Sequence, residues 1–149
     1  VAKTFGGVEH RIELVRTKDG VRFYNDSIAS SPTRTMAGLR SFPEKVILIA
    51  GGYDKHIPYD PLGPEICAHV KKLFLNGATG PKIRAAVERC PGDKPEMVDC
   101  PDFASAVKAA AEAAEPGDVV LMSPASAAFD QFKNFMVRGN YFKELVKEL

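Results

Sequence analysis

Residues 119–135 read VVLMSPASAAFDQFKNF, and this stretch decides the fold. The apolar run at 119–122 predicts a strand buried on both faces, as in a parallel sheet. The small residues that follow predict a tight turn, and Asp130 is predicted to cap the next helix. Open α/β sheets bind ligands at such strand-to-helix passages, and free amides there favour an anion. Most such loops bind nothing, so a plain connection is an equal alternative.

The rest of the chain alternates short apolar runs with amphipathic ones. Runs at 10–17 and 21–24, separated by Asp19-Gly20, predict a β-hairpin. Further strands are predicted at 45–50, 72–75 and 96–99, and helices at 32–42, 61–70, 79–90, 101–114 and 140–149, with Ser31 and Thr79 as caps. This alternation predicts one α/β domain with a doubly wound, mostly parallel sheet, to which the hairpin adds an antiparallel edge.

Composition excludes several classes of protein. The 149 residues carry a net charge of +1 with scattered Lys and Arg, which gives no electrostatic basis for binding nucleic acid. No apolar run has the roughly 20 residues of a membrane span. Three cysteines without a CxxC spacing or a neighbouring histidine predict free thiols in a reducing cytoplasm and no metal site. The start, without Met or an apolar leader, is that expected of a piece excised from a longer protein.

Three loops are expected to form a site, because the carboxyl ends of parallel strands meet at one edge of a sheet. They are residues 26–31, 51–56 and 123–130. Two glycines let the second loop bend, so that Lys55 either aims its ammonium at a carboxylate or is simply solvated. His56 is a possible general base, but no nucleophile accompanies it, and an exposed loop histidine is the simpler reading. Neither GxGxxG nor GxxxxGK[ST] occurs, so the chain describes half a site, without catalytic residues of its own.

Five motifs occur in order along the chain. They are HRxE (10–13), GVxFxNDS (20–27), GGxDK (51–55), PGD (116–118) and SPAxAxFDQFKNFxxRGxxF (123–142). Together they resemble the C-terminal domain of the bacterial Mur ligases, specifically of the branch that adds D-glutamate. The resemblance covers nearly the whole chain, and it implies that residues 1–149 are the third, Rossmann-like domain of a three-domain enzyme.

The resemblance also implies an activity for the whole enzyme. ATP phosphorylates the carboxylate of UDP-N-acetylmuramoyl-L-alanine, and the amine of D-glutamate attacks the acyl phosphate and displaces phosphate. ATP and Mg²⁺ are held mostly by the central domain, so no cofactor is expected in this fragment and the fragment alone is expected to be inactive. The implied setting is peptidoglycan biosynthesis by a cytoplasmic enzyme, which we expect to be a monomer that binds neither nucleic acid nor membrane.

The resemblance assigns roles to seven residues. Its D-glutamate contacts are Lys55, Ser30 (in place of a threonine), the backbone amide of Phe135, Ser126 and Ala128, and its nucleotide contacts are Arg11 and Asp26. Two positions depart from the pattern. Ile28 replaces a lysine, and Ala128 replaces a serine whose lost hydrogen bond is worth roughly 0.5–1.5 kcal/mol unless Ser126 or a water supplies it.

Two alternatives follow from these departures. One keeps the ligase superfamily but changes the substrate to another amino acid or a folate-type acceptor. The other is a stand-alone small-ligand or protein-binding α/β module, which an upstream GxxxxGK[ST] would exclude.

Overall fold

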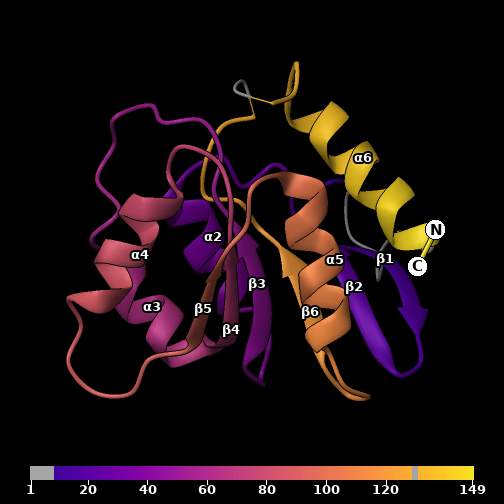
Figure 1. Cartoon of the computed structure of the whole chain (residues 1–149), viewed down its shortest axis with the longest axis horizontal. Coiled ribbons are helices and arrows are strands. Elements are labelled where there is room, and N and C mark those ends of the chain that lie inside the picture. Colours follow the sequence, from indigo (N-terminus) through magenta and orange to yellow (C-terminus); the bar gives the residue numbers. More distant parts are fainter. Residues whose placement is uncertain (1–8, 129–130) are drawn as a thin grey trace.

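The apolar run around Leu121 forms an inner strand of a six-stranded sheet (Figure 1). A computed structural model describes residues 9–128 and 131–149. The strands are β1 (Glu13–Lys18), β2 (Val21–Asn25), β3 (Val46–Ala50), β4 (Val70–Leu75), β5 (Glu96–Asp99) and β6 (Val119–Met122). The helices are α2 (Pro32–Leu39), α3 (Leu62–His69), α4 (Gly80–Glu88), α5 (Phe103–Ala113) and α6 (Phe135–Lys147).

The strand order is β1-β2-β6-β3-β4-β5. Only the β1–β2 pair is antiparallel, and the other four pairings are parallel. The predicted fold class is therefore confirmed: a doubly wound, mostly parallel sheet whose N-terminal hairpin supplies one antiparallel edge. Strand β6 enters last in sequence but lies between β2 and β3, so the chain segments that follow these three strands are neighbours in space.

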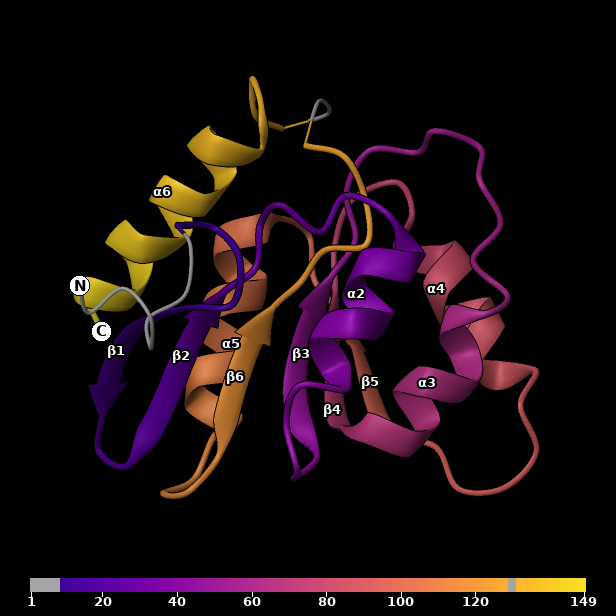
Figure 2. The ribbon, with the colours of Figure 1, turned by 180° about the vertical axis from the view of Figure 1, so that it is seen from behind.

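Helices cover both faces of the sheet, which explains why the inner strands are uninterrupted apolar runs. Along β3, Val46 and Leu48 pack into the cluster that contains α2, α3 and α4. Ile47 and Ile49 face the opposite way, into the cluster under α5 and α6. Figure 2 shows α2 and α3 on one side of the sheet, with α5 behind it. Each inner strand therefore joins two hydrophobic cores.

The final helix begins earlier than predicted. It starts at Phe135 rather than near residue 140, and the Asn134 side chain caps it by accepting from the Val137 amide at 2.9 Å. Asp130, the predicted cap, lies outside the described residues, and the segment 131–134 is not helical. Ser31 and Thr79 precede helices as predicted, but neither side chain makes a capping hydrogen bond.

Gly139 accounts for the early start being missed. A glycine inside a helix costs about 1 kcal/mol relative to alanine, which favours placing the helix after it. Here a Cβ at Gly139 would lie 2.2 Å from His10 Nδ1, so only glycine lets α6 pack this closely on the segment that leads into β1. Among the described residues, each helix is too short or too polar to cross a bilayer.

Candidate functional site

The loops after β2, β6 and β3 meet at one edge of the sheet, because these strands are parallel neighbours. Backbone hydrogen bonds join two of the loops directly. The Gly51 amide donates to Pro124 O at 2.9 Å, and the Tyr53 amide donates to Ala127 O at 2.8 Å. The predicted convergence of the three loops is confirmed.

Gly51 allows the sharp bend that the sequence predicts after β3. Its φ is +112°, and a Cβ there would lie 1.8 Å from Asn76 O. Gly52 is equally close to its surroundings, since a Cβ on it would lie 2.6 Å from Ala127 O. Side chains at these positions would push the loops apart, so glycine is required for the loops to pack.

Arg138 ties the edge together from within. Its side chain is only 1% exposed, and its guanidinium donates to Ser27 Oγ at 2.9 Å, Ser27 O at 2.7 Å and Ser126 O at 2.8 Å. Ser27 Oγ in turn donates to Phe135 O at 2.7 Å. One guanidinium thus links the loop after β2 to the loop after β6, and Ser27 carries the link to the start of α6.

Sequence reasoning recognised Arg138 only as a letter in a motif and assigned it no role. A signal was available: Arg138 shares a helical face with Phe142 and Val146, both fully buried. A cation on an apolar face must find its hydrogen-bond partners inside the protein.

Ser126 and Ala128 lie beneath the surface of the edge. The Ser126 hydroxyl is bonded to Tyr59 Oη at 2.9 Å and to Thr79 Oγ1 at 2.7 Å. Ala128 is buried, and its carbonyl accepts from the amides of Gln131 and Phe132. Both residues therefore shape the loop, and the Ser126 hydroxyl already has partners within the protein.

Lys55 is exposed on the loop after β3, on the same edge as Ser30 and Phe135. Its neighbour Asp54 is held by Lys82 Nζ at 2.6 Å, and the pKa of Asp54 is lowered chiefly by this bond. Lys55 itself has no ion pair with any described residue. The loop is thus anchored beside an ammonium that can meet a ligand.

Ser30 and Phe135 supply the remaining predicted D-glutamate contacts. Ser30 is half-buried in the turn after β2, where its amide donates to Ile28 O at 2.8 Å. Phe135 is the first residue of α6, so its amide belongs to the helix turn whose donors lack intrahelical acceptors. A hydroxyl and a helix N-terminal amide are suitable partners for a carboxylate.

Asp26 is the buried acid of the edge, with 3% of its surface exposed. Its Oδ2 accepts from Ser123 Oγ at 2.7 Å, and its Oδ1 accepts from the Ile12 amide at 3.2 Å. Burial raises the pKa of Asp26 to about 6, although these hydrogen bonds oppose the rise. The carboxyl group can therefore change protonation near neutral pH.

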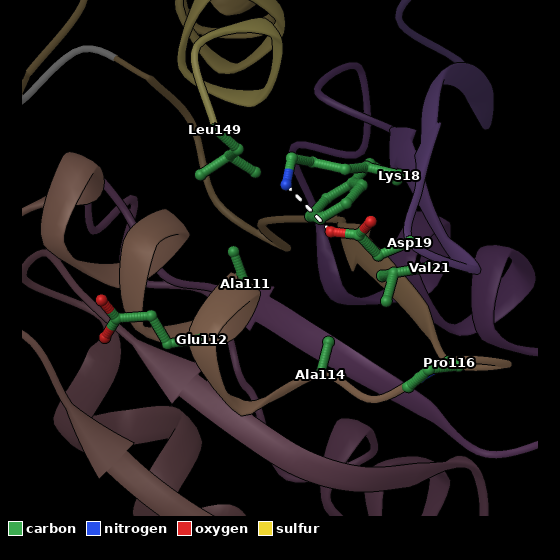
Figure 3. Close-up of a pocket in the computed structure, with 9 residues that line it drawn as sticks. Lys18, Asp19, Val21, Ala111, Glu112, Ala114, Pro116 and Leu149 are labelled. Carbon is green, nitrogen blue, oxygen red and sulfur yellow. Dashed lines mark hydrogen bonds and ion pairs between the residues drawn. The ribbon is translucent and has the colours of Figure 1, made fainter.

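A hollow of about 150 Å³ opens beside Asp26 and Arg11, so the two predicted nucleotide contacts lie together. Helix α2 forms one wall of this hollow, and Arg34, which the sequence analysis did not single out, stands on that wall. A second hollow, of about 290 Å³, lies at the other edge of the sheet, between the hairpin turn near Asp19 and Pro116 before β6 (Figure 3). The sequence-predicted site residues are absent from its lining.

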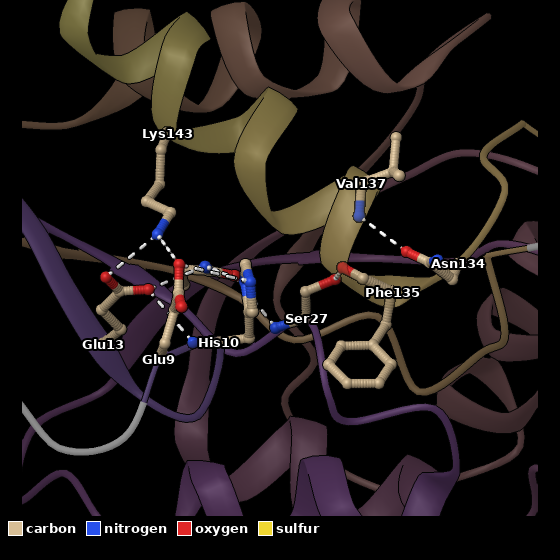
Figure 4. Close-up of polar contacts among 9 residues, drawn as sticks. Glu9, His10, Glu13, Ser27, Asn134, Phe135, Val137 and Lys143 are labelled. Carbon is tan, nitrogen blue, oxygen red and sulfur yellow. Dashed lines mark hydrogen bonds and ion pairs between the residues drawn. The ribbon is translucent and has the colours of Figure 1, made fainter.

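A polar cluster fixes the segment before β1 to α6 (Figure 4). Lys143 Nζ donates to Glu9 at 2.8 Å and to Glu13 at 3.2 Å. Asn25 Nδ2 lies 2.9 Å from His10 Nδ1 and 3.1 Å from a Glu13 oxygen. Burial lowers the pKa of the His10 imidazole. Glu9, His10 and Glu13 could group around a metal, but the ammonium already neutralises both carboxylates, so we assign an ion-pair cluster.

Comparison with known proteins agrees with this description. Residues 10–126 match the family described as Mur ligase, glutamate ligase domain. The UDP-N-acetylmuramoylalanine--D-glutamate ligase of Acetivibrio thermocellus is 61% identical over the whole chain, and that of Clostridium beijerinckii is 55% identical. The chain spans 33% of each of these relatives.

Solved structures show the same fold at low identity. A murein peptide ligase from Psychrobacter arcticus superposes with a TM-score of 0.64 at 15% identity, over 96% of this chain and 29% of that one. Folylpolyglutamate synthase from Thermotoga maritima gives a TM-score of 0.59 at 16% identity, over 94% and 31% of the two chains.

Proposed function

Because the chain belongs to the Mur ligase family, glutamate ligase domain, we propose that it is the amino-acid-binding domain of an ATP-dependent D-glutamate ligase. The observation that carries the proposal is the 61% identity to such a ligase across all 149 residues. In this proposal residues 1–149 are the C-terminal one of three domains in a monomeric cytoplasmic enzyme of peptidoglycan biosynthesis.

In the proposed reaction the γ-phosphoryl group of ATP passes to the carboxylate of UDP-N-acetylmuramoyl-L-alanine, giving ADP and an acyl phosphate. The amine of D-glutamate attacks the acyl carbon, loses a proton, and displaces inorganic phosphate as the amide bond forms. This chain contributes binding and orientation, which lower the barrier by holding the amine near the reactive carbon. The triphosphate and Mg²⁺ are held mostly by the central domain, since this chain has no P-loop.

D-glutamate binds, in this proposal, at the edge formed by the loops after β2, β3 and β6. Lys55 pairs with one carboxylate, because its ammonium is exposed and has no ion pair with a described residue. The Ser30 hydroxyl and the Phe135 amide hold a carboxylate from the other side. Ser126 and Ala128 act by shaping the loop beneath the ligand.

The nucleotide contacts of this domain are Arg11 and Asp26. Arg11 is an exposed guanidinium suited to bidentate contact with phosphate oxygens. The Asp26 carboxylate is suited to accept from a ribose hydroxyl. Both line the same hollow, so one nucleotide can reach both.

The amino-acid part is tested on the chain itself by nuclear magnetic resonance titration with D-glutamate and L-glutamate. We expect D-glutamate to shift the amide resonances of Lys55, Ser30 and Phe135, and L-glutamate to shift them less. Lys55→Ala is expected to weaken binding about tenfold, the usual scale for one charge-assisted contact. Lys45→Ala is the matched control, because Lys45 is equally exposed but precedes β3 at the opposite edge.

Equal responses to the two enantiomers, or an equal loss in both variants, would refute D-glutamate binding at this edge. In the full-length ligase, Lys55→Ala is expected to raise the KM for D-glutamate and leave the KM for ATP unchanged. The isolated chain is expected to show neither ligase nor ATPase activity, and ATP hydrolysis by it would contradict the proposed division of labour.

A further inference from the structure

We propose that Arg34 is a second phosphate-binding residue, acting with Arg11 across the hollow beside Asp26. This inference rests on the proposed function, because it adds a nucleotide contact to the same site. Its ligand class is the polyphosphate group of a nucleotide. The placement of α2, the charges around the hollow and the residue at position 28 support it independently.

Helix α2 presents one face to the hollow. Arg34, Ala37, Gly38 and Ser41 line it, and their spacing of three, four and seven residues is that of one helical face. A Cβ at Gly38 would lie 2.8 Å from Asp26 Oδ2, so glycine allows this face to touch the buried acid. Arg34 stands one turn before Gly38 on that face, which places its side chain at the wall of the hollow.

Thr35 fixes this orientation of α2. Its Oγ1 donates to Ser123 O at 3.2 Å and accepts from Ser123 Oγ at 2.9 Å. The same Ser123 hydroxyl lies 2.7 Å from Asp26 Oδ2. The residue next to Arg34 is therefore joined through Ser123 to the acid at the hollow, so Arg34 is held at a defined place despite its exposure.

The charges around the hollow favour an anion. Arg11 and Arg34 are both exposed, and neither forms an ion pair with another described residue. Asp26 is the only acidic residue in the lining, and its two oxygens already accept from Ser123 and Ile12. Two guanidinium groups that share one small hollow repel each other until an anion lies between them, and their planar forks match phosphate oxygens.

Position 28 supports the same assignment. Ile28 lines the hollow, at the position where the resemblance described above has a lysine. An isoleucine there leaves the loop after β2 without that cation, and Arg34 brings a cation to the same hollow from α2. The hollow thus keeps two positive side chains while their source in the fold changes.

The inference is tested on the 149-residue chain with inorganic pyrophosphate and with ADP, followed by amide shifts of Ile12, Ile28 and Ala29. Arg34→Ala is expected to weaken pyrophosphate binding about tenfold, and Arg34→Lys less, because lysine keeps the charge but loses the fork. Arg40→Ala is the control: it removes the same charge next to α2, but Arg40 pairs with Glu65 and does not line the hollow. Ile28→Lys in the Arg34→Ala background is expected to restore most of the lost affinity.

The outcomes separate this inference from the proposed function. If Arg11→Ala weakens binding and Arg34→Ala does not, the role of Arg34 is refuted while the nucleotide site stands. If Arg40→Ala weakens binding as much as Arg34→Ala, the effect is general electrostatics and the inference fails. If neither anion shifts any resonance around the hollow in the unaltered chain, the nucleotide contacts of the proposed function fail together with it.

Discussion

At Asp26, burial and hydrogen bonding act in opposite directions on one carboxyl group. Burial disfavours the charged form, while the donors Ser123 and Ile12 favour it, and burial prevails. The pKa of the group is therefore raised from 3.8 to about 6 in the folded chain. Since the unfolded chain releases this proton at lower pH, the folded state is most stable, with respect to Asp26, while the group stays protonated.

The stability contributed by protonated Asp26 is predicted to be present below about pH 4 and lost as pH rises through about 6. The pKa difference corresponds to a loss on the order of 3 kcal/mol. Urea unfolding of the unaltered chain and of Asp26→Asn at several pH values measures the difference between them. That difference should shift against the unaltered chain by this amount between about pH 4 and 7. A constant difference, or an Asp26 pKa near 4 by carbon-detected titration, would contradict the prediction.

Arg138 is predicted to be essential for folding stability. Arg138→Met keeps the apolar stem but leaves the carbonyls of Ser27 and Ser126 without this donor, at a cost of roughly 2–5 kcal/mol. Arg138→Lys should recover only part of this, because an ammonium lacks the planar fork. Arg89→Met, at an exposed ion pair with Asp60, is the control and should cost less than about 1 kcal/mol in the same denaturation experiment. Equal losses at the two arginines would argue against the structural role.

At the scale of elements, α6 shows how a local rule gives way to packing. Gly139 is unfavourable for a helix taken alone, yet His10 occupies the space that a side chain would need. Gly139→Ala is therefore predicted to destabilise the chain by about 2 kcal/mol or more, although alanine has the higher helix propensity. Thermal unfolding measures the loss.

His10→Ala combined with Gly139→Ala removes the clash and should recover stability relative to the sum of the two single changes. Gly80→Ala, at the start of α4, is the matched control, because a Cβ there would have only Leu75 nearby, at 3.6 Å. Strictly additive effects of the His10 and Gly139 substitutions would show that the two sites do not interact.

The strands were predictable because their signal is local. The bounds of β6 and β5 match the prediction, since each is a short run set off by turn residues such as Pro116-Gly117. The start of α6 and the caps at Ser31 and Thr79 were not predictable in the same way. The Thr79 hydroxyl accepts from the Gly52 amide and contacts Ser126, and both partners are remote in sequence.

The whole molecule is predicted to unfold in one step. The sheet carries a hydrophobic cluster on each face, and β3 and β6 contribute side chains to both clusters. Loss of either cluster therefore exposes strands of the other. The chain has four tyrosines and no tryptophan, so far-ultraviolet circular dichroism and tyrosine fluorescence are suitable probes. Coincident urea transitions are expected, and separated transitions would contradict a single cooperative domain.

For the whole site, topology was the predictable part. Residues as distant as Ser30, Lys55 and Phe135 were assigned to one edge because parallel strands end together, and the strand order bears this out. Their roles toward a ligand remain predictions. The roles of Arg138 and Arg34 were not foreseen, because each depends on which residues lie across from it: a buried pair of serines for the first and a small hollow for the second.

The guanidinium of Arg138 has a consequence for the thermodynamics of binding. Because it joins two loops, and Ser27 extends the link to α6, the edge takes its shape when the chain folds rather than when a ligand arrives. The entropy lost in ordering these segments is then already spent in the free domain, so little of the contact energy of a small amino acid goes into arranging its own receptor.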